Sequence, residues 1–255
     1  MTKVVILCGG EGTRLKEHTE FIPKPLVRIG GKPILWHIMK IYSHYGCKDF
    51  ILCLGYKGDM IKQYFLNYEA ENFDFTLKLK KGHIDFPKKH EVEDWSVSCV
   101  DTGEKTLTGG RLKRISNYLD SKDFMVTYGD GVADIDINQL WKFHKEKGKM
   151  VTITGVHPVS KYGLIKINKG FEVVNFKEKP PLKDLINDGF MVCKREFIDL
   201  IKDDCMFEEN ILPELSRKKQ VAIYKHELFF HPMDTYKDYE SLNRIWNEKA
   251  NWKVW

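Results

Sequence analysis

Short apolar runs alternate with amphipathic stretches along the first part of the chain. Residues 4–8 (VVILC) and 50–55 (FILCLG) are continuous apolar runs bounded by glycine, a pattern typical of buried parallel strands. After Pro33, apolar residues recur at helical spacing until Gly46, and residues 59–68 predict a second helix. Strands that alternate with helices in this way predict a parallel sheet with crossover helices.

The rest of the chain continues this pattern and adds a small inserted sheet. It predicts strands over residues 97–100, 124–128, 151–156, 164–167, 173–176, 190–193 and 221–225. It predicts helices over residues 110–119, 138–147, 195–202, 209–217 and 235–248. The polar segment 80–95 is expected to form an excursion or hairpin at the domain edge. We therefore predict a single α/β domain over residues 1–255, Rossmann-like, with a mixed, mainly parallel sheet flanked by helices.

The composition of the 255-residue chain is that of an ordinary globular protein. Apolar residues make up 42% and charged residues 30% of it. The net charge of +5 comes without a dense run of lysine and arginine. This mild excess does not indicate nucleic-acid binding, and it suits anionic small-molecule substrates.

The cysteines and the apolar runs bear on location. The six cysteines have neither metal-ligand nor Cys-x-x-Cys spacing, so we expect reduced thiols. Residues 9–11 interrupt the first apolar run too early for a secretion signal, and no run approaches membrane-spanning length. We therefore expect a cytoplasmic protein without a membrane partner.

A glycine-rich loop follows the first predicted strand, because residues 9–14 read Gly-Gly-Glu-Gly-Thr-Arg. Glycines let a backbone turn sharply and bring N–H groups close to a ligand. The hydroxyl of Thr13 and the forked guanidinium of Arg14 suit phosphate oxygens. A plain turn would need one glycine and no arginine. A dinucleotide fingerprint would need glycine at Leu15, and a P-loop would need it at Leu26.

A stiff lysine lies ten residues beyond the glycine-rich loop. Pro23 and Pro25 flank Lys24 and restrict the backbone on both sides of it. A rigid ammonium near a triphosphate is valuable, because nucleotidyl transfer depends on positioning and charge neutralisation. On its own, Pro-Lys-Pro is more often a surface turn.

Together, the two motifs resemble the signature of the sugar-phosphate nucleotidyltransferases. The resemblance extends over essentially the whole chain to the glucose-1-phosphate cytidylyltransferase family. The segments that carry it are residues 30–39, 55–58, 101–103, 108–114, 127–132, 178–180 and 232–235.

The resemblance implies a role for each matching position. Residues from about 1 to 135 would form the nucleotide-binding half, and those from about 136 to 255 the acceptor-binding half. The catalytic residues would be Arg14, Lys24, Asp130 and Lys179. The nucleotide would be bound by Leu7, Cys8, Gly9, Gly10, Glu11, Gly12, Thr13, Arg14, Lys24, Lys105, Gly110, Arg111 and Gly129. The acceptor would be bound by Lys179, Asn187, Asp188 and Gly189, and Mg²⁺ by Asp130 and Asp234.

The residues themselves agree with the role of Asp130. It follows the apolar strand 124–128 between Gly129 and Gly131, so its carboxylate is expected at the carboxyl end of the sheet. Mg²⁺ usually takes one or two carboxylates together with phosphate oxygens. The plainer alternatives are a turn aspartate at Asp130 and a helix N-cap at Asp234.

The resemblance implies an enzyme that joins CTP to a phosphorylated small molecule and releases pyrophosphate. The family acceptor is glucose 1-phosphate, which gives CDP-glucose. Residues 108–111 differ from the corresponding segment of thymidylyl and uridylyl relatives, which favours CTP. The acceptor phosphate has a second pKa of about 6 and would attack the α-phosphorus directly. His37, His44, His144 and His231 are therefore interpreted as core or surface groups rather than general bases.

The acceptor half departs from the family pattern. Asp188 stands where the family has glycine, the segment 207–213 differs, and Phe230 and His231 replace tryptophan and glutamine. Polar changes in a tight site alter specificity strongly. Another sugar phosphate therefore stays open as the acceptor, as does a phosphorylated non-sugar, such as an amino-acid amide phosphate used in surface polysaccharide modification.

Two further expectations concern the protein as a whole. A nucleotide-binding sensor or subunit without catalysis is the alternative class, although it has no chemical need for both Asp130 and Asp234. The habit of the family implies a homo-oligomer.

Overall fold

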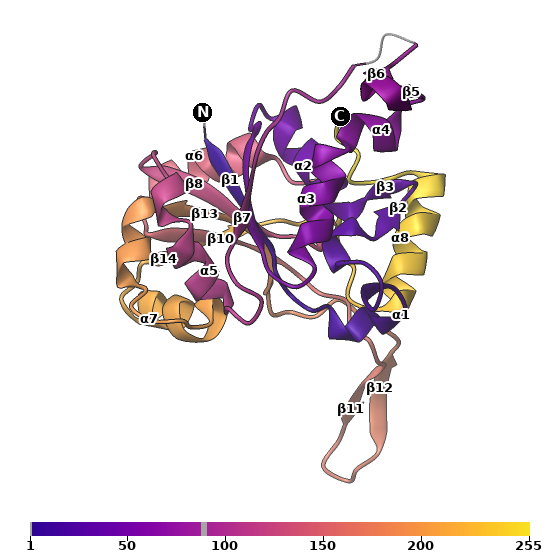
Figure 1. Cartoon of the computed structure of the whole chain (residues 1–255). Coiled ribbons are helices and arrows are strands. Elements are labelled where there is room, and N and C mark those ends of the chain that lie inside the picture. The colour runs from indigo at the N-terminus through magenta and orange to yellow at the C-terminus, as the bar shows by residue number, and fades with distance from the viewer. Residues whose placement is uncertain (1, 88–90) are drawn as a thin grey trace.

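The computed structural model of this chain describes residues 2–87 and 91–255 and is built on a seven-stranded sheet (Figure 1). The strands lie in the order β14 (Val221–Lys225), β10 (Val151–Val156), β13 (Ile186–Lys194), β8 (Asp123–Tyr128), β1 (Lys3–Cys8), β4 (Asp49–Leu54) and β7 (Ser96–Asp101). Neighbours from β8 to β7 are parallel, β13 is antiparallel to both its neighbours, and β10 is parallel to β14. The predicted mixed, mainly parallel sheet is therefore confirmed.

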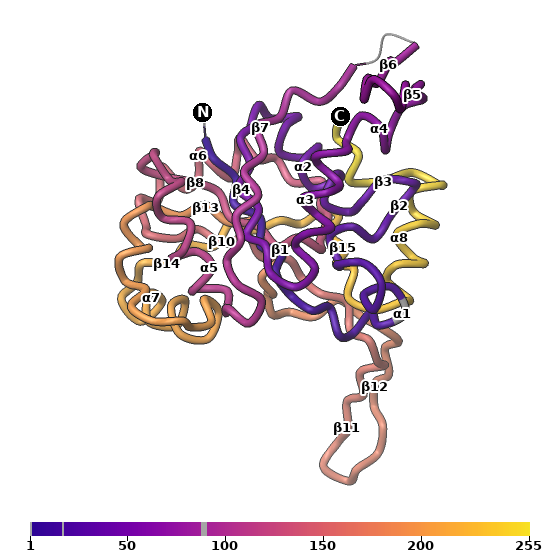
Figure 2. The backbone as a smooth tube through the Cα atoms, in the orientation of Figure 1, coloured from indigo at the N-terminus to yellow at the C-terminus, as the bar shows by residue number. Residues whose placement is uncertain are grey.

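Helices cover both faces of the sheet, as the tube in Figure 2 also shows. On one face, alternate residues of β1 such as Val4 and Ile6 pack in a core with α2, α3, α6 and α8. On the other, Val5 and Leu7 pack with α5 and α7. The helices are α1 (Lys16–Thr19), α2 (Ile34–His44), α3 (Gly58–Leu66), α4 (Tyr68–Asn72), α5 (Thr108–Arg114), α6 (Ile137–Lys147), α7 (Leu212–Arg217) and α8 (Tyr236–Glu248).

Four two-stranded ribbons surround this body. They are β2 (Arg28–Ile29) with β3 (Lys32–Pro33), β5 (Thr76–Lys78) with β6 (His83–Asp85), β9 (Gly131–Ala133) with β15 (Phe230–Pro232), and β11 (Leu164–Ile167) with β12 (Val173–Lys177). The β11–β12 hairpin projects away from the body (Figure 1) and is the predicted inserted sheet. The β5–β6 hairpin starts before the predicted excursion 80–95, of which residues 88–90 lie outside the described part of the chain.

The structure corrects several predicted bounds. The predicted helix 110–119 ends at Arg114, and a 3₁₀ turn follows it. The predicted helix 195–202 is a 3₁₀ segment, Arg195–Leu200. In place of helix 209–217, a π-helical turn, Phe207–Ile211, precedes α7, because Pro213 has no N–H to donate within a continuous helix.

The predicted strand 190–193 is part of the longer β13, Ile186–Lys194. The added part contains Asn187, Asp188 and Gly189, which are not typical strand residues. Within the described ranges, none of the helices combines the length and apolar character that crossing a membrane requires.

Candidate active site

The glycine-rich loop lies where β1 ends, beside the end of β8. Leu7 pairs with Tyr128 across the two strands, and the N–H of Gly129 donates to the carbonyl of Leu7 at 3.1 Å. Gly12 has φ +63°, a backbone conformation that favours glycine. The carboxyl ends of β1 and β8 thus bring the loop next to Asp130, as the sequence predicts for a parallel sheet.

Arg111 holds the loop in place. Its guanidinium is buried and donates to the carbonyl of Gly9 at 3.1 Å, and to the carbonyls of Leu54, Gly103 and Glu104 at 2.8–3.0 Å. A Cβ placed on Gly9 would lie 2.1 Å from the Cζ of Arg111. Arg111 therefore lines the cavity as predicted, but its guanidinium donates to the backbone carbonyls that shape the cavity.

Lys24 joins the two aspartates that were predicted as metal ligands. Its ammonium lies 2.6 Å from Asp130 Oδ2 and 2.9 Å from Asp234 Oδ1, and Arg14 Nη1 lies 3.2 Å from Asp234 Oδ2. Burial lowers the pKa of Lys24, but the two carboxylates outweigh burial and raise it. Burial raises the pKa of Asp234, but the Lys24 ammonium and Arg14 outweigh burial and lower it. Lys24 and Asp234 are thus both charged at neutral pH.

A short ribbon positions Asp234. β15 pairs with β9, which follows Asp130, and the N–H of Met233 donates to the carbonyl of Asp130 at 2.8 Å. The N-cap of α8 is Thr235, which forms a capping box with Asp238. Asp234 is therefore not the N-cap, and its carboxylate is available to the site.

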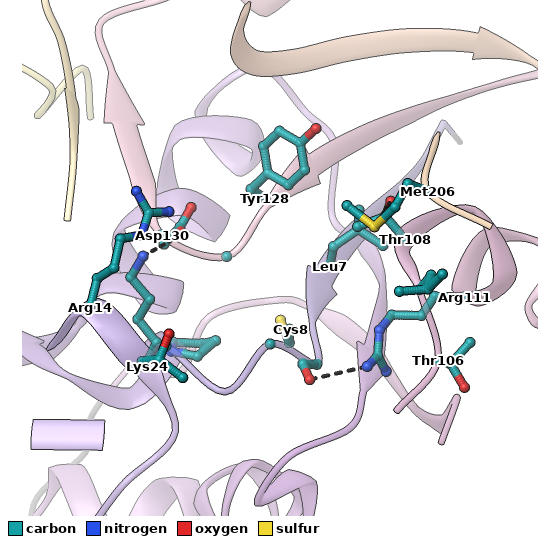
Figure 3. Close-up of a pocket in the computed structure, with 17 residues that line it drawn as sticks. Leu7, Cys8, Arg14, Lys24, Thr106, Thr108, Arg111, Tyr128, Asp130 and Met206 are labelled. Atoms are coloured by element: carbon teal, nitrogen blue, oxygen red, sulfur yellow. Dashed lines mark hydrogen bonds and ion pairs between the residues drawn. The ribbon is translucent and has the colours of Figure 1, made fainter. Parts of the chain in front are cut away.

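These groups line a cavity of about 330 Å³ (Figure 3). Figure 3 shows Arg14, Lys24 and Asp130 together on one side and Arg111 on the other. The lining includes most of the predicted nucleotide-binding residues, namely Leu7, Cys8, Gly9, Gly10, Gly12, Thr13, Arg14, Lys24, Arg111 and Gly129. It also includes Asp130, which was predicted as a catalytic residue and a metal ligand. Sequence reasoning missed Pro25, Thr106, Leu107, Thr108, Tyr128 and Met206. The position of Tyr128, directly before Gly129 and Asp130, was the signal that could have identified it.

Three predicted nucleotide-binding residues lie outside this lining. Glu11 and Lys105 are exposed. Gly110 is buried in α5, where an added Cβ would lie 2.0 Å from Asp204 Oδ1. The glycine at that position is thus explained by close packing inside the protein.

A second cavity of about 430 Å³ adjoins the first. Arg14, Thr108, Tyr128, Asp130 and Met206 line both cavities, so the acidic and basic groups stand at their junction. The lining of the second cavity is completed by Thr127, Gly131, Ile186, Asn187, Asp188, Glu208, Phe230, Pro232 and Asp234. Of these, Asn187 and Asp188 were predicted to bind the acceptor and Asp234 to bind the metal, whereas Glu208 was noted only as part of a divergent segment.

A hydrogen-bonded chain crosses the wall between the cavities. The Glu208 carboxylate accepts from the hydroxyl of Tyr128 at 2.5 Å and from that of Thr108 at 2.6 Å. Burial and the neighbouring Glu208 carboxylate raise the pKa of Tyr128, so its phenol stays neutral. Asn187 begins a turn in which its side-chain oxygen accepts from the N–H of Gly189 at 3.0 Å.

The structure changes the interpretation of two acceptor-side residues. The Asp188 side chain is fully buried and faces His226 rather than the cavity. Gly189 has φ +93°, and an added Cβ would lie 2.6 Å from the ring of Tyr128, so it serves the turn rather than the ligand. The Asp188 carboxylate, which replaces a glycine of the family pattern, is thus paired with a buried imidazole, and its predicted contact with the acceptor stays a prediction.

Lys179 is not brought to either cavity of its own chain. It lies just after β12 on the projecting hairpin, 55% exposed, and its ammonium is 3.7 Å from Glu178. Its predicted contact with the acceptor phosphate therefore stays a prediction, and it would require a second copy of the chain or movement of the hairpin.

The remaining polar groups argue against side-chain nucleophiles and bases at the site. Burial raises the pKa of the Cys8 thiol well above its usual range, so the thiol stays neutral. Burial lowers the pKa of His37 to about 4, and its Nε2 lies 2.8 Å from the carbonyl of Ile29 in the core. His144 is also buried, as interpreted from the sequence.

Cavities at the carboxyl ends of parallel strands, lined by a glycine-rich loop and by charged groups, define a nucleotide-binding α/β protein. The family model "Nucleotidyl transferase" matches residues 3–247, and the chain belongs to this family of nucleotidyltransferases. The full-length resemblance is confirmed by identity to the glucose-1-phosphate cytidylyltransferase of Salmonella typhimurium, 47% over 99% of both chains. The probable glucose-1-phosphate cytidylyltransferase of Bacillus subtilis is 43% identical over 99% of this chain and 100% of its own.

A solved structure shares the fold. HddC from Yersinia pseudotuberculosis superposes with a TM-score of 0.70 and 26% identity, covering 96% of this chain and 100% of its own. The predicted fold class is thus found in a solved relative as well as in this chain.

Proposed function

We propose that this protein transfers a cytidylyl group from CTP to glucose 1-phosphate, forming CDP-glucose and releasing pyrophosphate. The observation that carries the proposal is the junction of two cavities at one charged cluster. At that junction the Lys24 ammonium contacts Asp130 at 2.6 Å and Asp234 at 2.9 Å. A nucleotide in the first cavity and a sugar phosphate in the second would bring their phosphates together there.

The residues of the chain supply positioning and charge. The acceptor phosphate, with a second pKa of about 6, is a nucleophile at neutral pH and attacks the α-phosphorus. The new P–O bond forms as the bond to pyrophosphate breaks. Lys24 and Arg14 offset negative charge on the triphosphate, while the N–H groups of the loop from Gly9 to Gly12 orient it.

The two aspartates fit a divalent cation. Asp130 and Asp234 converge on one ammonium at 2.6 and 2.9 Å, so their oxygens face a common point where positive charge is stabilised. Among the residues the structure describes, no group of three or more candidate ligands is present, which suits a cation that takes its other ligands from phosphate and water. Bound Mg²⁺ would stabilise charge on the phosphates.

The acceptor proposed is glucose 1-phosphate because the Asp188 carboxylate is directed away from the second cavity. Its side chain is 0% exposed and lies 3.3 Å from His226 Nδ1, so its charge is paired inside the protein. The departure from the family pattern at this position is therefore compatible with the family acceptor.

A competition experiment tests donor and acceptor together. Purified protein receives Mg²⁺, glucose 1-phosphate and an equimolar mixture of CTP, UTP, dTTP, ATP and GTP, and products are identified by mass. CDP-glucose should dominate. A different nucleotide sugar as the main product would overturn the donor assignment.

A stereochemical experiment tests direct attack of the acceptor phosphate on the α-phosphorus. Net retention at the α-phosphorus of chiral CTP would overturn direct attack.

A homo-oligomer is part of the proposal. The β11–β12 hairpin exposes large apolar side chains, among them Phe171 at 84% and Val174 and Phe176 at about 60%. An isolated two-stranded ribbon is marginally stable in water, and such an apolar surface marks an interaction site. Replacing Val174 and Phe176 with lysine should lower the mass measured by light scattering, and an unchanged mass would contradict the role of the hairpin.

We also place the reaction in the cytoplasm. All six cysteines are unpaired in the structure, a state suited to a reducing compartment.

A further inference from the structure

A buried imidazole lies between two carboxylates behind the second cavity. His226 Nε2 is 2.9 Å from Asp134 Oδ1, and its Nδ1 is 3.3 Å from Asp188 Oδ2. The side chains of His226 and Asp188 are 4% and 0% exposed, and that of Asp134 is 23% exposed. Buried ionic groups are costly unless they are paired, so this arrangement calls for a reason beyond packing.

His226, Asp134 and Asp188 form a trio that holds β13, the strand that contains the turn from Asn187 to Gly189. Gly155 of β10 pairs with Asn187 of β13, and Ile153 pairs with Met191, so residues 188–190 bulge opposite a single residue of β10. At a bulge the ladder hydrogen bonds are interrupted. The Asp188 carboxylate instead accepts from the backbone N–H of Phe190 at 3.2 Å and faces the imidazole of His226. The backbone N–H of His226 donates to the carbonyl of Gly155 at 2.9 Å.

The same trio reaches the ribbon that carries the aspartates of the site. Asp134 follows β9, and its Oδ1 also accepts from the N–H of Phe229, the residue before β15. β9 begins directly after Asp130, and β15 ends two residues before Asp234. His226 therefore connects β13 to the β9–β15 ribbon, and both of these elements contribute residues to the lining of the second cavity.

The contacts fix the charge of the imidazole. Both ring nitrogens face carboxyl groups, which favours a ring that carries a proton on each nitrogen and donates to both. Burial raises the pKa of Asp188, and the hydrogen bond to His226 acts to lower it. Burial lowers the pKa of His226, but hydrogen bonds to Asp188 and Asp134 outweigh burial and raise it. Asp136 is a further charged group on this side of the sheet. Three tyrosines lie there as well, Tyr42, Tyr45 and Tyr224, and burial raises the pKa of each, so their phenols stay neutral. The charged side chains of Lys225 and Glu227, adjacent to His226 in sequence, are exposed.

We propose that His226, held as an imidazolium between Asp188 and Asp134, is a positioning residue for the acceptor. It sets the turn from Asn187 to Gly189 against the ribbon that carries Asp130 and Asp234. This inference rests on the proposed function and extends it, because it assigns the Asp188 departure from the family pattern to a pair with His226. Deprotonation of His226 removes one of the two links and loosens the acceptor cavity, while the first cavity, held by Arg111, is unaffected.

The test compares three variants with the parent enzyme. His226→Gln removes the charge and one link, and Asp188→Asn keeps a hydrogen-bond acceptor but removes one carboxylate. His144→Gln is the matched control, because His144 is also buried, 1% exposed and near an aspartate, Asp123, at the opposite end of β8 from Asp130. KM for glucose 1-phosphate, KM for CTP, kcat and Tm are measured for each from pH 6.5 to 9.

We expect His226→Gln to raise the acceptor KM by about tenfold or more with CTP KM within about twofold, because small misplacements of substrate are expensive. In the parent, the acceptor KM should rise as pH rises through the raised pKa of His226. In Asp188→Asn this rise should begin at lower pH, because one stabilising carboxylate is gone. His144→Gln should lower Tm and leave both KM values unchanged.

Several results would overturn the assignment. They are an acceptor KM for His226→Gln within twofold of the parent, equal increases of both KM values, or an unshifted pH midpoint in Asp188→Asn. If His226→Gln does not fold, the pH midpoint of the acceptor KM in Asp188→Asn decides whether His226 positions the acceptor. A folded parent that releases no pyrophosphate with CTP and any sugar phosphate would instead overturn the proposed function itself.

Discussion

Replacing Lys24 with methionine removes one positive charge from the junction of the cavities and keeps most of the side-chain volume. The Lys24 side chain is 10% exposed and makes contacts of 2.6 and 2.9 Å to Asp130 and Asp234. Two charge-assisted hydrogen bonds contribute about 1.5–3 kcal/mol each before the cost of burying the ammonium. Because the carboxylates are partly exposed, we expect a net loss of about 2–3 kcal/mol, or about 5–10 °C in Tm for a chain of this size.

The pH dependence of Tm checks that the loss comes from this cluster. The raised pKa of Lys24 contributes stability that is present below its unfolded pKa of about 10.4 and is lost as pH rises through the folded pKa. The lowered pKa of Asp234 contributes stability that is present above about pH 3.9 and is lost as pH falls through the folded pKa. Lys24→Met should lose the contribution of Lys24 and the part of the Asp234 contribution that comes from Lys24, while Arg14 keeps its contact with Asp234. The difference in Tm between variant and parent should therefore narrow at both extremes of pH.

Kinetics separate catalysis from stability. Losing one preorganised charge at the reacting phosphates should lower kcat by about 10²–10³-fold. Lys3→Met is the matched control, because Lys3 is 18% exposed and lies 3.1 Å from Asp120 near the opposite end of β1. The control should change Tm slightly and kcat not at all. A folded Lys24→Met protein with kcat within threefold of the parent would refute the reasoning.

The other predictions concern the loop, its support and the cation. Gly9→Ala places a Cβ 2.1 Å from Arg111, so it should lower the free energy of unfolding by about 1–3 kcal/mol and raise the KM for CTP. Gly10→Ala is the control, because its Cβ meets no described atom within 4 Å, and it should keep the parent Tm. Thermal melts and CTP titration compare the two variants. Arg111→Met leaves the carbonyls of Gly103 and Glu104 without a guanidinium donor, so the free energy of unfolding measured by calorimetry should fall by about 2–6 kcal/mol. An unchanged Tm would contradict the supporting role of Arg111. Chelating divalent cations should stop pyrophosphate release, and added Mg²⁺ should restore it. Asp130→Asn should nearly abolish turnover at any Mg²⁺ concentration. An Asp130→Asn protein that keeps more than about a tenth of the parent activity would contradict the metal site.

The sequence predicts the parts of the site that depend on local pattern. An apolar strand that runs into glycines fixes where β1 and β8 end, so the loop from Gly9 to Arg14 and the position of Asp130 could be predicted. The role of Lys24 was predicted from the combination of its Pro-Lys-Pro motif with the glycine-rich loop, which together carry the family resemblance. These features are set by neighbours in sequence, and parallel strands bring their carboxyl ends together.

Features that depend on distant contacts were missed. The use of the Arg111 charge on the carbonyls of Gly9 and Leu54 follows from how α5 packs against β4 and the loop. The pairing of Asp188 with His226 depends on a bulge in β13, and no short-range pattern reports such a register shift. Lys179 has a matching motif, yet the hairpin carries it away from the cavities of its own chain.

The most direct test of the central claim is the initial rate of pyrophosphate release from purified protein with Mg²⁺, CTP and glucose 1-phosphate. The account predicts rapid release that requires both substrates, with one CDP-glucose formed for each pyrophosphate. Binding of CTP without release, whatever sugar phosphate is added, would contradict it and identify the protein as a nucleotide-binding sensor or subunit.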